Sequence, residues 1–258
     1  MPARYALYFA PDPASALWRF GSRTLGYDAA TGASFPPVPP ASGLSLDWGE
    51  ASEEPRRYGF HATLKAPFEL HPERRESELV DALAGFAANH AALGAVPLTV
   101  AALGAFIALV PAEQSEGLQA LALRVVRDFE PFRAPLSAAD RARRLASPLS
   151  ERQIAHLDHY GYPYVDEDFR FHMTLTGKLP PGQIAPVRAA LADAFVAEVS
   201  EPAVPIDALA LYRQPSRADR FEILFRAPLA PSDPQASPRS SAVNSAATVS
   251  SARSLVTR

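Results

Sequence analysis

Two short segments of the chain repeat the same side chains capable of acid/base chemistry. Residues 60–64 are Phe-His-Ala-Thr-Leu, and residues 171–175 are Phe-His-Met-Thr-Leu. Histidine titrates near neutral pH and can therefore take up or release a proton during a reaction. A threonine hydroxyl can donate a hydrogen bond to an anion. A single His-x-Thr is a weak signal, but two copies in the same local context are a strong one.

Both segments predict strands, in which side chains alternate between two faces. His61 and Thr63 share one face of the first strand, and His172 and Thr174 share one face of the second. The imidazole and hydroxyl of each pair then lie roughly 6–7 Å apart. Two such strands facing each other place two acid/base groups and two hydroxyl donors around one small anion. The competing interpretation is a pair of core histidines bonded to backbone, which the repetition makes the weaker one.

The elements that follow each copy repeat as well: a turn, a helix and two strands. The predicted elements are a helix over 72–90 with strands over 98–103 and 106–110, then a helix over 181–199 with strands over 204–212 and 220–225. An internal duplication explains this order, and it predicts pseudo-two-fold symmetry. We therefore expect an α+β fold of two lobes, with antiparallel sheets around a central cleft and helices on the outside.

The rest of the chain divides into one domain and a tail. Residues 1–230 form the expected bilobal domain, with motif strands near 59–65 and 169–176. The Gly-, Pro- and Ser-rich residues 26–57 predict a long irregular loop, of the kind that often forms a flap or a substrate-binding wall. Residues 231–258 are rich in Ser and Ala and predict a disordered tail. The other expected elements are a strand over 5–10 and helices over 15–25, 114–129 and 137–160, the last interrupted near residue 148.

Composition excludes several classes of function. The 258 residues include no cysteine, which excludes a disulfide scaffold, thiolate metal sites and a cysteine nucleophile. The formal net charge of −3 gives no global attraction to nucleic acid or to an anionic membrane, so any anion site must be local. Residues 91–110 carry no charge over the length of a membrane span, but internal Gly and Pro favour two buried strands. We expect no signal peptide, a cytoplasmic location and a monomer.

The two His-x-Thr segments resemble the signatures of the two-histidine (2H) phosphoesterase superfamily. Residues 57–68 (Arg-Tyr-Gly-Phe-His-Ala-Thr-Leu-Lys-Ala-Pro-Phe), 161–165 (Gly-Tyr-Pro-Tyr-Val) and 169–177 (Phe-Arg-Phe-His-Met-Thr-Leu-Thr-Gly) are similar to an uncharacterised branch of it. Genes of that branch often lie in bacterial phosphonate-degradation operons. The resemblance covers residues 3–228. It implies a bilobal α+β fold, chemistry without metal or cofactor, and a phosphate-ester substrate.

This resemblance and the paired motifs together predict a metal-independent phosphodiesterase that hydrolyses a small cyclic phosphate ester. One of His61 and His172 is the base that activates water, and the other is the acid that protonates the leaving oxygen. Thr63 and Thr174 donate hydrogen bonds to the nonbridging oxygens. Phosphonate catabolism is a further expectation. The alternatives are a 2′,3′-cyclic nucleotide or RNA-end phosphodiesterase, a phosphate- or nucleotide-binding module without turnover, and a metal-dependent hydrolase.

Four side chains near the motifs are candidate substrate-binding residues. Lys65 lies two residues beyond Thr63 in the sequence and is expected on the same face, where its charge would attract phosphate. Arg57 and Tyr58 precede the first motif, and Tyr164 precedes the second. For each of them, ordinary packing or surface placement is the competing interpretation. Lys178 lies four residues beyond Thr174 and is also expected on the motif face, where it could add positive charge, but a solvated lysine at a strand end is the favoured interpretation.

Two other groups predict surface positions rather than a second site. His156 and His159 lie one helical turn apart, a spacing that can bind a metal, but no third ligand is evident. Arg141, Arg143 and Arg144 lie together in a helical stretch and could contact nucleic acid. Because the whole chain is acidic, a charged helix face is the better interpretation. A small phosphorylated molecule therefore remains the expected partner.

Overall fold

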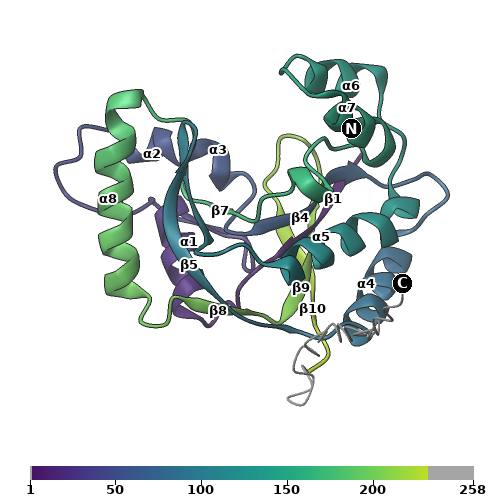
Figure 1. The fold of residues 1–258 in the computed structure, drawn as a ribbon, viewed down its shortest axis with the longest axis horizontal. Helices are drawn as coiled ribbons and strands as arrows, with labels where there is room; N and C mark the ends of the chain where they lie inside the picture. The colour runs from purple at the N-terminus through teal and green to yellow at the C-terminus, as the bar shows by residue number, and fades with distance from the viewer. Residues whose placement is uncertain (1, 232–258) are drawn as a thin grey trace, which may run out of the picture.

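The computed structural model describes residues 2–231, which form an α+β fold around one eight-stranded sheet (Figure 1). Each strand pairs antiparallel with its neighbours. In sheet order the strands are β10 (Glu222–Pro228), β9 (Ala208–Gln214), β1 (Arg4–Phe9), β4 (Ala62–Glu69), β7 (Met173–Thr174), β6 (Phe106–Pro111), β5 (Leu93–Leu103) and β8 (Ala203–Ile206). The predicted α+β class with an antiparallel sheet is confirmed. The predicted tail, residues 231–258, lies outside the described residues from 232 onward.

The two motif strands are neighbours at the centre of this sheet. Ala62 of β4 pairs with Met173 of β7. The strands therefore lie side by side in one sheet, and the expectation that they face each other across a cleft is wrong. The predicted lobes are the two halves of the continuous sheet.

The strands that follow each motif cross to the opposite half. β5 and β6 follow the first motif in the chain, yet β6 pairs with β7 of the second motif. β9 and β10 follow the second motif, yet β9 pairs with β1, the neighbour of β4. The repeat predicted from the sequence is thus built with exchanged strand pairs.

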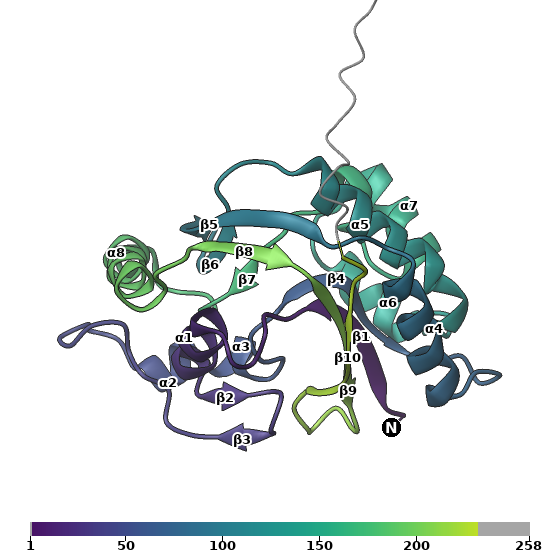
Figure 2. The same cartoon turned by 90° about the horizontal axis from the view of Figure 1, so that it is seen from below.

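The helices gather at the two ends of the molecule (Figures 1 and 2). α4 and α5 contact the half that contains β1, β4, β9 and β10, whereas α8 contacts β5 and β6 and also packs on α1. Serine side chains cap α1, α5 and α7 by accepting a hydrogen bond from a backbone N–H of the first turn. The helices are α1 (Ala16–Leu25), α2 (Trp48–Ala51), α3 (Glu53–Arg56), α4 (Glu76–Ala88), α5 (Glu116–Asp128), α6 (Ala138–Leu145), α7 (Glu151–Tyr160) and α8 (Pro181–Glu198).

The segment 26–57 is more ordered than an irregular loop. It contains a short hairpin of β2 (Tyr27–Asp28) and β3 (Ala33–Ser34), followed by α2 and α3. Trp48 of α2 is buried, and its Nε1–H donates to the carbonyl oxygen of Thr24 at 2.9 Å. The expectation of a long irregular loop is therefore wrong for its second part, where one buried tryptophan anchors two helical turns that composition alone did not reveal.

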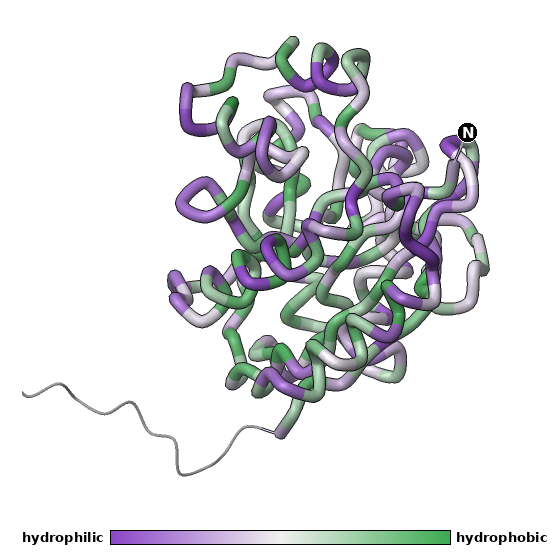
Figure 3. The backbone as a smooth tube through the Cα atoms, turned by 90° about the vertical axis from the view of Figure 1, so that its right-hand side faces the viewer, coloured by the Kyte–Doolittle hydropathy of each residue, from purple (hydrophilic) through white to green (hydrophobic). Residues whose placement is uncertain are grey.

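The uncharged segment 91–110 forms the hairpin of β5 and β6, as predicted, with Gly104 at its turn (φ 62°). Among residues 2–231, no helix combines the length and the apolar character needed to cross a membrane. Figure 3 shows hydrophobic stretches running through the centre of the fold and hydrophilic ones at its turns. The predicted strand over 204–212 is interrupted at Asp207, and only two residues of the predicted strand over 169–176 pair as a strand.

Candidate active site

The register of β1 against β4 decides which side chains share a face of the sheet. Tyr8 pairs with Thr63, and Leu7 pairs with Lys65. One step along β1 thus corresponds to two steps along β4, so Leu64 is an extra residue in a β-bulge. Directly paired residues point to the same face, and consecutive residues of β1 point to opposite faces. Thr63 and Tyr8 therefore share one face, and Lys65 is turned to the other.

Lys65 accordingly lies away from the histidines, and the expectation that it shares a face with Thr63 is wrong. Its side chain is only 3% exposed, and its Nζ donates to the Val126 carbonyl oxygen at 3.0 Å and to Glu130 Oε2 at 2.8 Å. Burial lowers the pKa of Lys65, and the adjacent Glu130 carboxylate opposes that shift. Lys65 fastens β4 to the end of α5 and is not placed to bind a substrate.

His61 is held by three contacts on the face shared by Tyr8 and Thr63. Its ring stacks on Tyr8, with 3.7 Å between centroids and 18° between planes. Its Nδ1 lies 2.9 Å from the carbonyl oxygen of Gly59, and its Nε2 lies 3.2 Å from Thr63 Oγ1. A carbonyl can only accept, so Nδ1 carries the proton and the Nε2 lone pair is the basic position. Burial lowers the pKa of His61 to about 4, and the neighbouring His172 adds to that effect.

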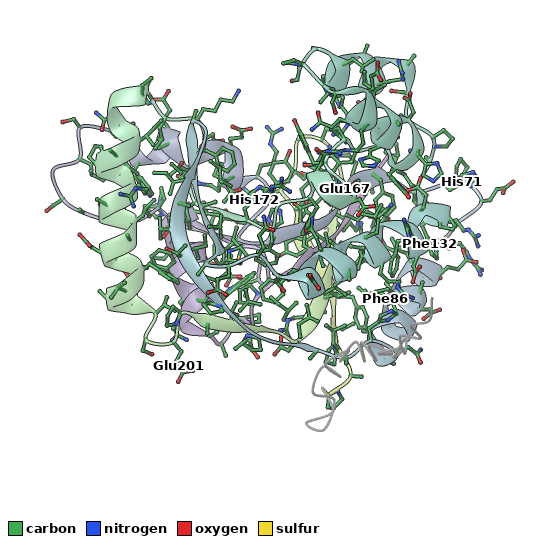
Figure 4. All side chains as sticks on the ribbon, in the orientation of Figure 1. His71, Phe86, Phe132, Glu167, His172 and Glu201 are labelled. Atoms are coloured by element: carbon green, nitrogen blue, oxygen red, sulfur yellow. The ribbon has the colours of Figure 1, made fainter. Side chains whose placement is uncertain are left out.

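His172 is held in the same way as His61. Its Nδ1 lies 2.7 Å from the carbonyl oxygen of Arg170, two residues earlier, just as His61 bonds to Gly59. Nε2 of His172 is therefore the basic position, as it is in His61. The ring lies 5.8 Å from that of Phe106, and burial lowers the pKa of His172. Figure 4 places His172 near the middle of the molecule, between the α2–α3 side and the α6–α7 side.

A cavity of about 240 Å³ opens beside His61. It brings together the first histidine, the second threonine and a lysine, which can bind, orient and exchange protons with a small anion. Tyr58 lines it, as the sequence predicts. The lining residues are Glu54, Pro55, Tyr58, Gly59, His61, Phe106, Thr174, Thr176, Gly177 and Lys178. We refer to this space as the histidine pocket.

Two of the predicted substrate-binding residues lie elsewhere. Arg57 lines a different hollow, together with Tyr27 and Glu222. Tyr164 is 43% exposed and packs edge-on against Tyr162, with 5.5 Å between ring centroids. Lys178 is exposed, as the sequence predicts, and it also lines the histidine pocket. Its alternation with Thr174 and Thr176 is the signal that predicts this face.

The residues described, 2–231, contain no group of three or more His, Cys, Asp and Glu side chains placed to hold a metal ion. His156 Nδ1 lies 3.9 Å from Asp168 Oδ2, and His159 packs edge-on against Tyr160. Each of the two histidines therefore contacts a different protein side chain, in or next to α7.

The chain belongs to the family described as "Protein of unknown function (DUF1045)", whose match covers residues 63–222. This agrees with the uncharacterised branch that the motifs resemble. The match begins within the first motif and includes all of the second. The family therefore spans both halves of the central sheet.

Two curated relatives carry the name "Ribose 1,5-bisphosphate phosphokinase PhnN". The protein from Janthinobacterium sp. (strain Marseille) is 37% identical over 82% of this chain and 47% of its own length. The protein from Laribacter hongkongensis (strain HLHK9) is 34% identical over 85% of this chain and 50% of its own length. The chain thus spans about half the length of the curated relatives it matches.

Solved structures show a more distant likeness in fold. The structure of Escherichia coli LigT complexed with ATP aligns with 89% of this chain and 98% of its own, at 14% identity and a TM-score of 0.41. A structure described as a phosphoesterase aligns with 89% of this chain and 99% of its own, at the same identity and TM-score. The chemistry proposed below rests on the site itself.

Proposed function

We propose that this protein is a metal-independent phosphodiesterase that hydrolyses a small cyclic phosphate ester with two histidines. The observation that carries the proposal is the shared geometry of His61 and His172. Each donates its Nδ1–H to the carbonyl two residues earlier, so that Nε2 carries the lone pair in both rings, and His61 Nε2 lies 3.2 Å from Thr63 Oγ1. Two imidazoles fixed in one tautomer are the parts needed to move one proton from water and another to a leaving oxygen.

The electrostatic environment favours His61 as the base and His172 as the acid. Burial lowers the pKa of His61 to about 4, so this ring is neutral at neutral pH and its Nε2 can accept a proton from water. The pKa of His172 is also lowered by burial, but by less. A bound phosphodiester anion raises the pKa of both rings, because opposite charge nearby stabilises the protonated form. His172 is then the ring that gains a proton more readily.

The other groups hold the charge of the reacting phosphate. Thr174 lines the histidine pocket, where its hydroxyl can donate to a nonbridging oxygen. The Thr63 hydroxyl donates to His61 Nε2 in the structure, and it can turn to a nonbridging oxygen once Nε2 has taken up a proton. Lys178 adds a positive charge to the lining. A cyclic ester suits the small pocket, because its leaving oxygen stays tethered after the bond to phosphorus breaks. Water supplies the new oxygen, and the product is a phosphomonoester with one free hydroxyl.

The curated relatives support a substrate from phosphonate or ribose-phosphate metabolism. They are named for the phosphorylation of a ribose bisphosphate, and this chain matches about half of each. A cyclic phosphate of a pentose is therefore the first substrate to test, ahead of 2′,3′-cyclic nucleotides and RNA ends.

The test is turnover of a panel of cyclic phosphates by protein treated with a chelator. The panel contains cyclic phosphates of pentoses, 2′,3′-cyclic nucleotides and short RNAs with cyclic ends. His61→Ala and His172→Ala are compared with His159→Ala, which removes an exposed histidine from α7. We expect His61→Ala and His172→Ala each to lose at least about a thousandfold in kcat while the control keeps its activity.

The outcomes separate the competing functions. Activity lost with the chelator and restored by a divalent cation would identify a metal-dependent hydrolase. Binding of the panel without any turnover would identify a binding module. Equal turnover by His172→Ala would remove this residue from the mechanism.

A further inference from the structure

A second hollow, of about 130 Å³, lies where the start of β1 meets α6 and the turn after α7. Five arginines and two carboxylates are among its lining residues, in a protein whose formal net charge is −3. We call it the arginine hollow. Its charged lining residues are Arg4, Arg133, Arg143, Arg144, Arg217, Glu69 and Asp140. The cavity volume equals the share of about four water molecules in the liquid, which suits a small anion.

Acidic side chains neutralise three of these arginines. Arg133 pairs with Glu130 at 2.6 Å, and Arg143 pairs with Asp140 at 2.5 Å. Arg217 lies 3.2 Å from Glu69 and 3.4 Å from Asp140. In the described part of the chain, neither Arg4 nor Arg144 has a carboxylate within 4.0 Å. These two guanidinium groups therefore supply the uncompensated charge of the hollow.

Arg144 is half-buried, and its most buried donor lacks the partner that such a group normally has. Its Nε is buried and has no hydrogen-bond partner among residues 2–231. Its guanidinium carbon lies 5.4 Å from the centre of the Tyr162 ring, which fixes the group by a cation–π contact. Burial lowers the pKa of Arg144, as expected for a charge without full compensation. A buried donor of this kind is costly unless a ligand completes its hydrogen bonds.

Arg4 is fixed on the other wall of the hollow. Its Nε donates to Gln214 Oε1 at 2.8 Å, and its guanidinium lies 5.4 Å from the centre of the Phe221 ring. Burial lowers its pKa, and the nearby charge of Arg217 lowers it further. Arg4 and Arg144 thus present two oriented guanidinium groups, each held by an aromatic ring, to the same small space. Arg144 keeps the planar fork that matches phosphate oxygens in two-pronged fashion. Arg4, whose Nε and Nη2 both donate to Gln214 Oε1, offers its remaining N–H groups.

A chain of aromatic contacts connects the arginine hollow to the histidine pocket. The two share no lining residue. Phe221, on which Arg4 lies, stacks on Tyr58 with 5.3 Å between centroids. Tyr58 in turn lines the histidine pocket and lies 6.3 Å from the ring of His61. The rings of Phe221 and Tyr58 therefore link the wall of the arginine hollow to the ring of His61.

The strand β1 sets the distance between the two sites. Arg4 and Tyr8 are four residues apart and point to the same face, and Tyr8 carries the His61 ring. Four strand residues span about 13 Å. Because the Arg4 side chain is long, the gap left for a ligand is shorter than this. A sugar with phosphates at its two ends is of the size that spans such a gap.

We infer that the arginine hollow binds a second phosphate, a phosphomonoester carried on the same small molecule whose cyclic phosphate lies at His61 and His172. This inference rests on the proposed function and narrows its substrate class to sugar phosphates with one cyclic and one terminal phosphate. The terminal phosphate anchors the molecule in Arg4 and Arg144, and the ester reacts about one sugar length away. Binding energy from the distant group then positions the reacting ester.

The test compares matched substrates that differ only in the terminal phosphate. A pentose cyclic phosphate and a nucleoside 2′,3′-cyclic phosphate are each assayed with and without a phosphate at carbon 5. We expect kcat/KM to be at least tenfold higher with the phosphate, and Arg144→Gln and Arg4→Gln to lower that ratio toward one. Arg141→Gln is the control, since this residue of α6 is paired with Asp158 at 2.6 Å outside the hollow. Circular dichroism and melting curves establish that the variants fold.

A binding measurement keeps this inference separate from the proposed function. Calorimetry on His172→Ala protein compares the same ligands and inorganic phosphate. Tighter binding of the terminally phosphorylated ligand that depends on Arg144 supports the inference even if no ester is hydrolysed. Turnover that is equal with and without the terminal phosphate supports the enzyme but overturns the second site. Arg144-dependent binding of inorganic phosphate alone, with no preference between the matched esters, makes the hollow a free-phosphate site and also overturns it.

Discussion

The ring of His61 lies flat on the ring of Tyr8, with their centroids 3.7 Å apart. Tyr8 is only 1% exposed and lies next to the end of β1, a strand paired with β9 on one side and β4 on the other. The His61 imidazole, a candidate catalytic group, therefore packs on the ring of Tyr8, which cannot move without disturbing the core. The Gly59 carbonyl fixes the same imidazole from one edge. Together these contacts prepare His61 for proton transfer before any ligand binds.

Removing the aromatic support should slow the reaction without abolishing binding. We expect Tyr8→Leu to reduce kcat by about tenfold with a smaller change in KM, because the His61 ring loses its orientation. Tyr8→Phe keeps the stacked ring and should retain most of the activity. Steady-state kinetics on a cyclic phosphate give both constants. If Tyr8→Leu matched the wild type in kcat, the stack would have no role in positioning.

The rate should have an acidic optimum in kcat/KM. The base must be deprotonated, so kcat/KM rises as the pH passes the pKa of His61, which is about 4. The acid must be protonated, so kcat/KM falls as the pH rises through the pKa of His172, which burial holds below its usual value of 6.5. Initial rates at low substrate from pH 3.5 to 9 reveal both limbs. A profile that keeps rising to pH 9 would argue against the two assigned roles.

Folding stability should fall as the solution becomes acidic. The folded His61 binds its proton only near pH 4, whereas the unfolded ring binds one near pH 6.5. Between these values the unfolded state holds more protons, so the free energy of unfolding decreases as the pH falls through this window, by up to about 3 kcal/mol. Urea unfolding at pH 7 and pH 4.5 measures the change. His61→Gln should lose part of this pH dependence, and an unchanged dependence would contradict the assigned pKa.

Gly59 is a position that an L side chain cannot occupy without strain. Its φ is 74°, and a Cβ there would lie 2.7 Å from the Cβ of Ala29. We expect Gly59→Ala to lower the free energy of unfolding by about 1–3 kcal/mol and to lower kcat, because the displaced carbonyl no longer holds His61. Gly85→Ala is the matched control: Gly85 lies in α4 with open space around it, and alanine there should be neutral or stabilising.

The two lysines that follow the motifs should behave in opposite ways. Lys65→Ala should lower the free energy of unfolding by about 1–3 kcal/mol and leave KM unchanged, because Lys65 pairs with Glu130 beneath the sheet. Lys178→Ala should leave stability unchanged and raise KM several-fold, since its charge lines the histidine pocket. Melting curves and KM values for both variants test the contrast. A raised KM for Lys65→Ala would return that residue to the list of substrate contacts.

The features of the candidate site that depend on local sequence pattern could be predicted from the sequence. The spacing of His61 and Thr63, and the helices and hairpins around the motifs, follow from side-chain alternation and helical periodicity. Lys65 was misplaced because the bulge at Leu64 depends on the register with β1, which is more than fifty residues earlier in the chain. The pairing of Ala62 with Met173 also depends on contacts distant in sequence.

The arginine hollow illustrates the same limit. Arg143 and Arg144 are neighbours in α6, and in the sequence they suggest only a charged helix face. Arg4, more than a hundred residues earlier, joins them through strand pairing, and Arg217, more than seventy residues later, joins them from the turn after β9. Charge that is dispersed along a chain becomes a local field only after folding.

The exchange of strand pairs between the two halves has a consequence for how the chain folds. Arg4 is paired with Gln214, so the first strand acquires its second neighbour only from the far end of the domain. Contacts this distant in sequence slow folding, because a long loop must close before they form. If either half of the repeat were made alone, strands that now pair with the other half would be left with unpaired backbone groups. During synthesis, the support beneath His61 is therefore completed only when β9 has left the ribosome.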